Sequence, residues 1–145
     1  PSRGLGDVYK RQAAYTGVIP IMLNKIDAKE APVINGNGSQ AYDFIDVRDV
    51  ARCNLLAMKS EATDEFYNVG TGVQTSIRKL CDTILELKKS DLEVTYKPYS
   101  DVDTRRMVQN RIGCTRKAKK ELDFEHEIEL RKGLQDLIAW REANK

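Results

Sequence analysis

The sequence predicts an α/β protein built from about five helices and a few short strands. In several separate segments, apolar residues recur at three- and four-residue spacing, which is typical of helices that bury one face. Between them lie short runs rich in β-branched and aromatic residues, and glycine turns follow some of these runs. Because the runs are few and short, they favour a small lobe of an α/β protein, or the edge of a larger sheet, over a complete doubly wound domain.

The first half of the chain opens with an amphipathic helix that carries Pro20 in its first turn, where a missing amide hydrogen costs little. Asp46 is expected at the start of the second helix, as its N-cap or first-turn acid, with Asp49 also near the positive end. In order, the expected elements are a helix over 17–26, a strand entering a turn over 32–38, a strand over 42–47, a helix from 46 or 47 to 59, and a strand over 65–69 closed by glycines at 70–72.

The second half is predicted to be mainly helical. Thr75 or Ser76 suits the N-cap of a helix that runs to about residue 87. The last helix is expected to place Trp140 with its other apolar residues. After the first of these helices, the expected elements are an edge strand over 92–96, a long loop over 98–110, a short basic helix from Thr115 to Leu122, and the last helix over 130–141.

Composition excludes several classes of function. Lys and Arg total 24 against 22 for Asp and Glu, so the net charge of +2 gives no field that would favour nucleic acid or a membrane surface. The three cysteines are far apart, and the single histidine, His126, leaves no set of metal ligands. No apolar run suits a membrane span or a secretion signal, so a cytoplasmic protein without a metal is expected.

The first twelve residues are expected not to belong to the fold. They show no apolar periodicity, and Val8 to Gln12 can be back-translated to GTG-TAT-AAG-AGA-CAG, which resembles the end of a transposon-derived sequencing adapter. The alternative is an ordinary basic terminus. We therefore expect residues 1–12 to be an artefact without ordered structure and residues 13–145 to be the protein proper.

Two glycine-rich turns, at 36–38 and 70–72, invite comparison with phosphate-binding loops, but neither has the spacing of such a motif. Tight turns that need positive φ explain them better. No tyrosine is followed by lysine four residues later, so the Tyr-x-x-x-Lys pair used for hydride-coupled proton transfer is absent. No catalytic residue is therefore expected in this chain. The loop over 103–111 carries three arginines, whose guanidinium groups suit a diphosphate, although a solvated basic loop explains the spacing equally well.

Read together, five segments resemble the C-terminal half of UDP-glucose 4-epimerase-like enzymes. These enzymes belong to the NAD-dependent epimerase/dehydratase family, within the extended short-chain dehydrogenases/reductases. The segments are Val-Ile-Pro at 18–20, Val-Ile-Asn-Gly-Asn-Gly at 33–38, Asp-Phe-Ile-Asp-Val-Arg-Asp-Val-Ala at 43–51, Phe-Tyr-Asn-Val-Gly-Thr-Gly at 66–72 and Thr-Ser-Ile at 75–77. The combination of the segments at 33–38 and 43–51 with the one at 66–72 is specific to this family.

The resemblance implies a two-part enzyme. A Rossmann half, expected upstream of Ala13 and missing here, would bind NAD and carry the catalytic residues, while this lobe would bind a UDP-sugar or another nucleotide sugar. The parent enzyme is expected to be a homodimer. A 4-epimerase is favoured, and a 4,6-dehydratase, a decarboxylase or a non-catalytic module that binds sugar nucleotides stay open.

Substrate contacts are implied at seven positions, four of them in the first two elements. Gly17 and Val18 stand where the family's helix start approaches the sugar nucleotide. Val33 and Asn35 stand where the chain flanks the base.

The other three positions are implied to meet the diphosphate. Tyr42 stands where many members of the family have an arginine, and its phenol can donate a hydrogen bond without supplying charge. Arg105 or Arg106 matches the family's second phosphate arginine, in the loop ahead of the final helices. The resemblance therefore favours the diphosphate interpretation of that loop over the solvated one.

Overall fold

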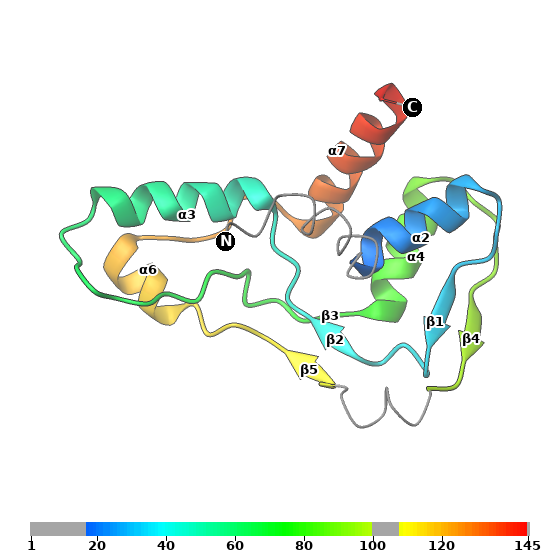
Figure 1. Cartoon of the computed structure of the whole chain (residues 1–145), viewed down its shortest axis with the longest axis horizontal. Helices are drawn as coiled ribbons and strands as arrows, with labels where there is room; N and C mark the ends of the chain where they lie inside the picture. The colour runs from blue at the N-terminus through cyan, green and yellow to red at the C-terminus, as the bar shows by residue number, and fades with distance from the viewer. Residues whose placement is uncertain (1–16, 100–107, 145) are drawn as a thin grey trace, which may run out of the picture.

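The computed structural model describes residues 17–99 and 108–144, and within them it shows five helices and five short strands (Figure 1). The α/β class is therefore confirmed. In chain order the elements are α2 (Val18–Asp27), β1 (Val33–Asn35), β2 (Ala41–Tyr42), α3 (Val47–Lys59), β3 (Thr75–Ser76), α4 (Ile77–Leu87), β4 (Thr95–Lys97), β5 (Asn110–Arg111), α6 (Arg116–Leu122) and α7 (Leu130–Ala143).

The strands form two small sheets. β1 and β4 pair in parallel, with Ile34 opposite Tyr96. The other sheet has the order β3-β2-β5, in which β2 runs antiparallel to β3 and parallel to β5. A side-chain hydrogen bond from Gln40 Nε2 to the carbonyl oxygen of Asn35, at 3.1 Å, links the end of β1 to the start of β2.

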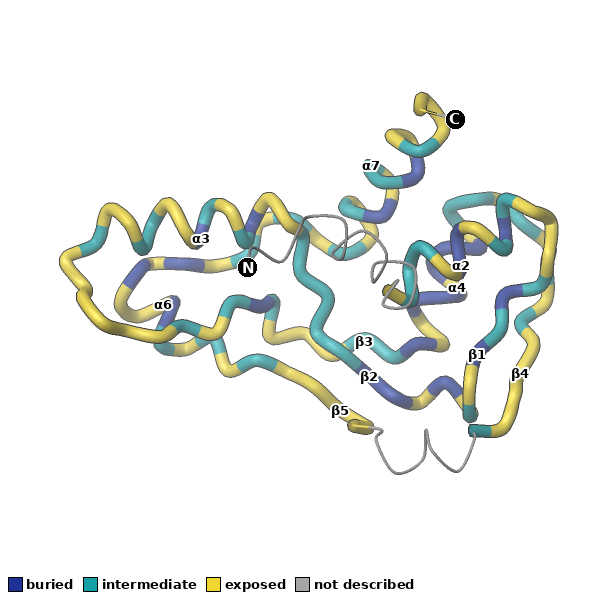
Figure 2. The backbone as a smooth tube through the Cα atoms, in the orientation of Figure 1, coloured by how far each residue is buried: buried dark blue, intermediate teal, exposed yellow. Residues whose placement is uncertain are grey.

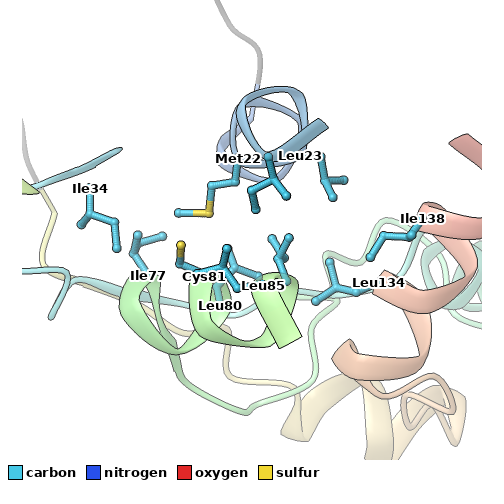
Figure 3. Packing of buried hydrophobic residues seen from close by; sticks show 11 residues of the cluster. Met22, Leu23, Ile34, Ile77, Leu80, Cys81, Leu85, Leu134 and Ile138 are labelled. Carbon is cyan, nitrogen blue, oxygen red and sulfur yellow. The ribbon is translucent and has the colours of Figure 1, made fainter. Parts of the chain in front are cut away.

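The main core lies between three helices and strand β1 (Figure 3). Met22 and Leu23 of α2 face Leu80 of α4, with Ile34 at one side and Leu134 of α7 at the other. Each of these side chains is at most 2% exposed, so α2, β1, α4 and α7 are fixed relative to one another by close packing.

A second, smaller core joins α3 to α6. Cys53 of α3 packs with Ala118 and Leu122 of α6 and with Phe124, and all four are buried. The opposite side of α3 is exposed along most of its length (Figure 2). The two cores lie at opposite ends of the molecule, and α3 and α6 stand apart from α2 and α4 (Figure 1).

The five predicted helices are confirmed, and so are two of their starts. The Asp46 carboxylate accepts a hydrogen bond from the Arg48 amide, and the Ser76 hydroxyl accepts one from the Lys79 amide. Thr115 occupies the N-cap position of α6, but its side chain caps no amide there. Of the described helices, none is long and apolar enough to cross a membrane.

Three expectations about the elements were wrong. Residues 65–69 form no strand, because no neighbouring strand among the described residues completes a ladder with them. Phe66 in this segment is 90% exposed. The strand expected over 42–47 pairs only at Ala41–Tyr42. Trp140 is 64% exposed, whereas Leu134 and Ile138 of the same helix are buried.

Candidate functional site

No side chain among the described residues caps the start of α2. Gly17 occupies the N-cap position with extended backbone, and the first turn of the helix contains no acidic residue. Backbone amides at a helix start have no partner within the helix, and the helix dipole adds partial positive charge there. Val18 is partly buried against the main core, so the helix start is held by packing.

Of the predicted residues in β1 and β2, only Tyr42 packs against the main core. Val33 is partly buried, Asn35 is exposed at the strand's end, and Ile34 between them is buried in the main core. Tyr42 also packs against that core, and its ring meets Phe44 edge to face at 6.2 Å. The elements α2, β1 and β2 thus meet around one cluster of buried side chains, against which Val18, Ile34 and Tyr42 pack.

The remaining two predicted residues, Arg105 and Arg106, lie outside the described residues. They lie in the chain between β4 and β5, where the described residues end at Tyr99 and resume at Val108. Their contacts with a diphosphate stay a prediction from the resemblance.

Asp43, directly after Tyr42, organises the glycine turn at 70–72. Its carboxylate accepts hydrogen bonds from the Thr71 amide at 2.9 Å, the Thr71 hydroxyl at 2.6 Å and the Gly72 amide at 2.9 Å. Gly70 is buried, and a Cβ there would lie 2.5 Å from the Asp43 carboxylate. The prediction that this turn is structural is confirmed.

Neither glycine turn fits the phosphate-binding loop of a dinucleotide site such as that for NAD. The amides of Thr71 and Gly72, which a phosphate would need, already donate to Asp43. Gly36 and Gly38 have φ of +74° and +76°, and the turn that they form leads into strand β2, not into the start of a helix. These glycines form the tight turn predicted from the sequence, so no NAD contact is assigned to this chain.

A large apolar hollow of about 690 Å³ opens between residues 43–48 and helix α7. Phe44, Leu137 and Trp140 are among its lining residues, and none of the described site residues lines it. At its rim Arg48 donates to the carboxylates of Asp46 and Asp136, and the hydrogen bond from Arg48 is the main reason that the pKa of Asp46 is lowered. An apolar surface of this size is typical of a packing partner or a ligand.

Asp49 has a role that local sequence reasoning missed. It is 1% exposed, and its carboxylate accepts hydrogen bonds from the amides of Glu127 and Ile128 at 3.0–3.1 Å and from Arg52 at 2.9 Å. Burial alone would raise its pKa, but these hydrogen bonds, led by that of Arg52, outweigh it and lower the pKa. No local pattern signals this role, because its backbone partners lie 78 and 79 residues away.

The described part of the chain contains no cluster of three or more potential metal ligands, and two of its three cysteines are buried. The third, Cys114, is exposed, and a hydrogen bond from Arg116 lowers the pKa of its thiol. Cys53 and Cys81 are buried and free, and burial raises the pKa of the Cys81 thiol to about 11. A thiol with so high a pKa is a poor nucleophile at neutral pH.

Comparison with known proteins relates this arrangement to a family. The sequence model described as the NAD dependent epimerase/dehydratase family matches residues 4–70. A candidate UDP-glucose 4-epimerase of Methanocaldococcus jannaschii is 33% identical over 129 residues, which cover 88% of this chain. A UDP-N-acetyl-α-D-glucosaminuronate decarboxylase of Bacillus cytotoxicus is 24% identical over 132 residues, or 90% of this chain.

Among solved structures, the UDP-glucose 4-epimerase of Thermotoga maritima with UDP-glucose superimposes on 89% of this chain, with a TM-score of 0.78 and 32% identity. The chain spans about 40% of the length of each of these three relatives. The similarity in sequence and in structure extends over nearly the whole of the described fold. The chain belongs to the NAD-dependent epimerase/dehydratase family of extended short-chain dehydrogenases/reductases.

Proposed function

We propose that this chain is the C-terminal, substrate-binding part of an NAD-dependent nucleotide-sugar epimerase of the UDP-glucose 4-epimerase type. The observation that carries the proposal is the match of 89% of the chain to an epimerase structure that contains UDP-glucose. In this proposal the chain binds the nucleotide sugar and does not by itself catalyse its conversion. NAD and the catalytic residues belong to the remainder of the parent enzyme, which we propose to be a cytoplasmic homodimer.

The geometry of α2 supports a diphosphate as the group that is bound. The helix start offers backbone amides without a side-chain cap, and phosphate groups commonly bind to such amides. Asn35, at the exposed end of β1, is available to the nucleotide base, and Tyr42 offers a phenolic hydroxyl. Val18 and Tyr42 both pack against the main core, so the elements that carry them are already held relative to one another before a ligand binds.

A decarboxylase or a 4,6-dehydratase is the alternative within the family. The epimerase is preferred because identity reaches 32–33% for the two epimerases and 24% for the decarboxylase. A non-catalytic module that binds sugar nucleotides is the alternative outside enzyme function. It differs from the main proposal in requiring no Rossmann half in the parent protein.

Binding of UDP-glucose to the chain tests the proposal directly. We expect UDP-glucose and UDP to bind in isothermal titration calorimetry and to shift the amide resonances of Gly17, Val18 and Asn35. Replacement of Gly17 by Asp should weaken binding about tenfold or more, because a carboxylate at the N-cap would occupy the free amides and repel the diphosphate.

The same replacement should leave the fold intact, which separates binding from stability. Gly17 has φ of −62°, and the nearest atom to an added Cβ is 4.0 Å away, so a side chain fits. The matched control is Gly17→Ala, which adds a methyl group without charge and should bind nearly as well as the native chain. Absence of binding by the folded native chain would overturn the proposal.

A further inference from the structure

Two asparagines between strands β1 and β2 are each followed by a glycine. They are Asn35 and Asn37, and the sequence contains no other Asn-Gly pair. Asparagine before glycine is prone to deamidation, because glycine has no side chain to keep its backbone nitrogen away from the side-chain amide of the asparagine. Both asparagines are exposed, so water reaches both. The local sequence is nearly the same at the two pairs, and a difference between them must come from the fold.

The fold protects Asn35. This residue ends strand β1, where its Cα partner is Lys97 of β4. The Gly36 amide, whose nitrogen would have to attack the Asn35 side chain, donates to the Lys97 carbonyl oxygen at 2.7 Å. The Asn35 carbonyl oxygen accepts a further hydrogen bond from Gln40 Nε2 at 3.1 Å. The Gly36 amide therefore keeps its proton and cannot turn toward the side chain without breaking the ladder.

Asn37 is in the opposite situation. Its Oδ1 accepts a hydrogen bond from the Ser39 amide at 3.0 Å, a local contact typical of asparagine in turns. This bond keeps the side-chain carbonyl close to the backbone that follows Asn37, which includes the Gly38 nitrogen. Within residues 17–99 and 108–144, no hydrogen bond holds the Gly38 amide. The attacking nitrogen is therefore free, and the carbon that it attacks is held nearby.

We propose that Asn37 is a site of deamidation and that the fold spares Asn35. After hydroxide removes the proton of the Gly38 amide, its nitrogen attacks the Asn37 Cγ, and the new C–N bond closes a succinimide ring. The bond from Cγ to Nδ2 breaks, and ammonia leaves. Water then opens the ring at either carbonyl and gives aspartate or isoaspartate, so the net reaction takes up water and releases ammonia. The Ser39 amide donates to the oxygen on which negative charge develops during the attack, which lowers the barrier.

The isoaspartate product lengthens the backbone of this turn by a methylene group. The turn is attached to helix α4 through Gly38, whose carbonyl oxygen accepts a hydrogen bond from the Arg78 amide at 3.0 Å. Gly38 is also buried, and a Cβ there would lie 3.1 Å from the Arg78 Cβ and 3.3 Å from a methyl group of Ile34. A longer backbone does not fit this close packing, so the modified chain should be less stable than the native one.

Incubation of the native chain at mildly alkaline pH, followed by tryptic digestion and tandem mass spectrometry, tests the proposal. A single tryptic peptide, residues 30–48, contains both asparagines, so its fragment masses report the two sites side by side. Asn37 should deamidate about tenfold or more faster than Asn35. Comparable rates at the two sites, a faster rate at Asn35, or no reaction at either in the folded chain would overturn the proposal.

The control is the same incubation in denaturant, which removes the fold and keeps both Asn-Gly pairs. There the two rates should become nearly equal. A preference for Asn37 that persists in denaturant would show that neighbouring sequence and not the fold makes the difference, and would also overturn the proposal.

The matched variant is Asn37→Gln, which keeps a side-chain amide but closes a ring far less readily. It should lack the fast reaction and keep its midpoint of thermal unfolding during the incubation, whereas the midpoint of the native chain should fall as Asn37 reacts. Deamidation goes beyond the proposed function and is measured without a ligand. A folded chain that fails to bind UDP-glucose would therefore overturn the proposed function and leave the modification site unaffected.

Discussion

At the scale of single residues, the most consequential side chains are two buried or half-buried carboxylates that hold loops. Asp43 secures the turn at 70–72, and Asp49 secures the backbone at residues 127 and 128. Each acts by accepting backbone amide hydrogens that would otherwise lack partners. Asp49 also pairs with Arg52, whose guanidinium lies over the Phe124 ring at 5.0 Å.

Replacement of Asp49 by Asn should lower the free energy of unfolding by about 2–3 kcal/mol, because Asn replaces one of the two acceptor oxygens with an NH2 donor, which must face either the backbone amides or Arg52, and Arg52 also loses its charge partner. Denaturant unfolding at neutral pH measures this loss. Replacement of Asp82, an exposed carboxylate on α4 that also pairs with an arginine, is the control and should cost less than about 1 kcal/mol.

The same carboxylate predicts a dependence of stability on pH. The folded pKa of Asp49 is below its unfolded value, so as pH falls the unfolded chain takes up the proton first and the stabilisation is lost. The difference in unfolding free energy between the native chain and Asp49→Asn should therefore be full above about pH 5 and shrink toward about pH 3. A difference that stays constant over this range would contradict the assigned role.

At the scale of elements, α4 is the helix on which the main core is built. Leu80, Cys81 and Ile84 are fully buried in the main core, where α4 packs against α2 and α7 (Figure 3). The start of α4 continues directly from strand β3, so a single residue, Ser76, both ends the strand and caps the helix. Stability of the helix start is therefore coupled to the sheet that contains β2.

Ser76→Ala should lower the free energy of unfolding by about 1 kcal/mol, because the Lys79 amide loses the hydroxyl that it donates to at 3.1 Å. The matched control is Thr115→Ala at the start of α6, where the side chain makes no capping hydrogen bond, and its cost should be near zero. Paired chemical denaturation curves give both values. Equal losses for the two replacements would show that the hydrogen bond at Ser76 does not carry the effect.

At the scale of the whole molecule, the surface contains an apolar stripe that nothing in the described structure covers. Val47, Ala51, Leu55 and Met58 recur on one side of α3 and are all exposed, while the other side packs on the second core (Figure 2). Val47 also lines the hollow beside α7, so the stripe and the hollow adjoin, and such an apolar surface is typical of a packing interface. This agrees with the proposal that the chain works as part of a larger enzyme.

The chain on its own should therefore self-associate as concentration rises. The double replacement Leu55→Glu with Met58→Lys leaves the net charge unchanged and favours the helix, so it should reduce association without lowering the midpoint of thermal unfolding. Sedimentation velocity over a range of concentrations measures the effect. A native chain that stays monomeric at all concentrations would show that this surface does not drive association.

The sequence by itself determined the helices and two of their starts. Apolar spacing within ten or so residues defines a helical face, and the caps at Asp46 and Ser76 act on amides two or three residues away. The glycine turns at 36–38 and 70–72 were predictable for the same reason, since positive φ is a local requirement. For the site, the resemblance supplied the positions at α2, β1 and β2.

Only the tertiary structure decided which strands pair and which charges meet. Strand pairing joins segments far apart in the chain, so local pattern could not place Arg111 beside Tyr42 or β4 beside β1. Residues 65–69 have the composition of a strand yet form none, because a strand requires a neighbour to accept its hydrogen bonds. Asp49 became a buried support only because folding brought residues 127 and 128 to it, a contact that packing rather than local sequence determines.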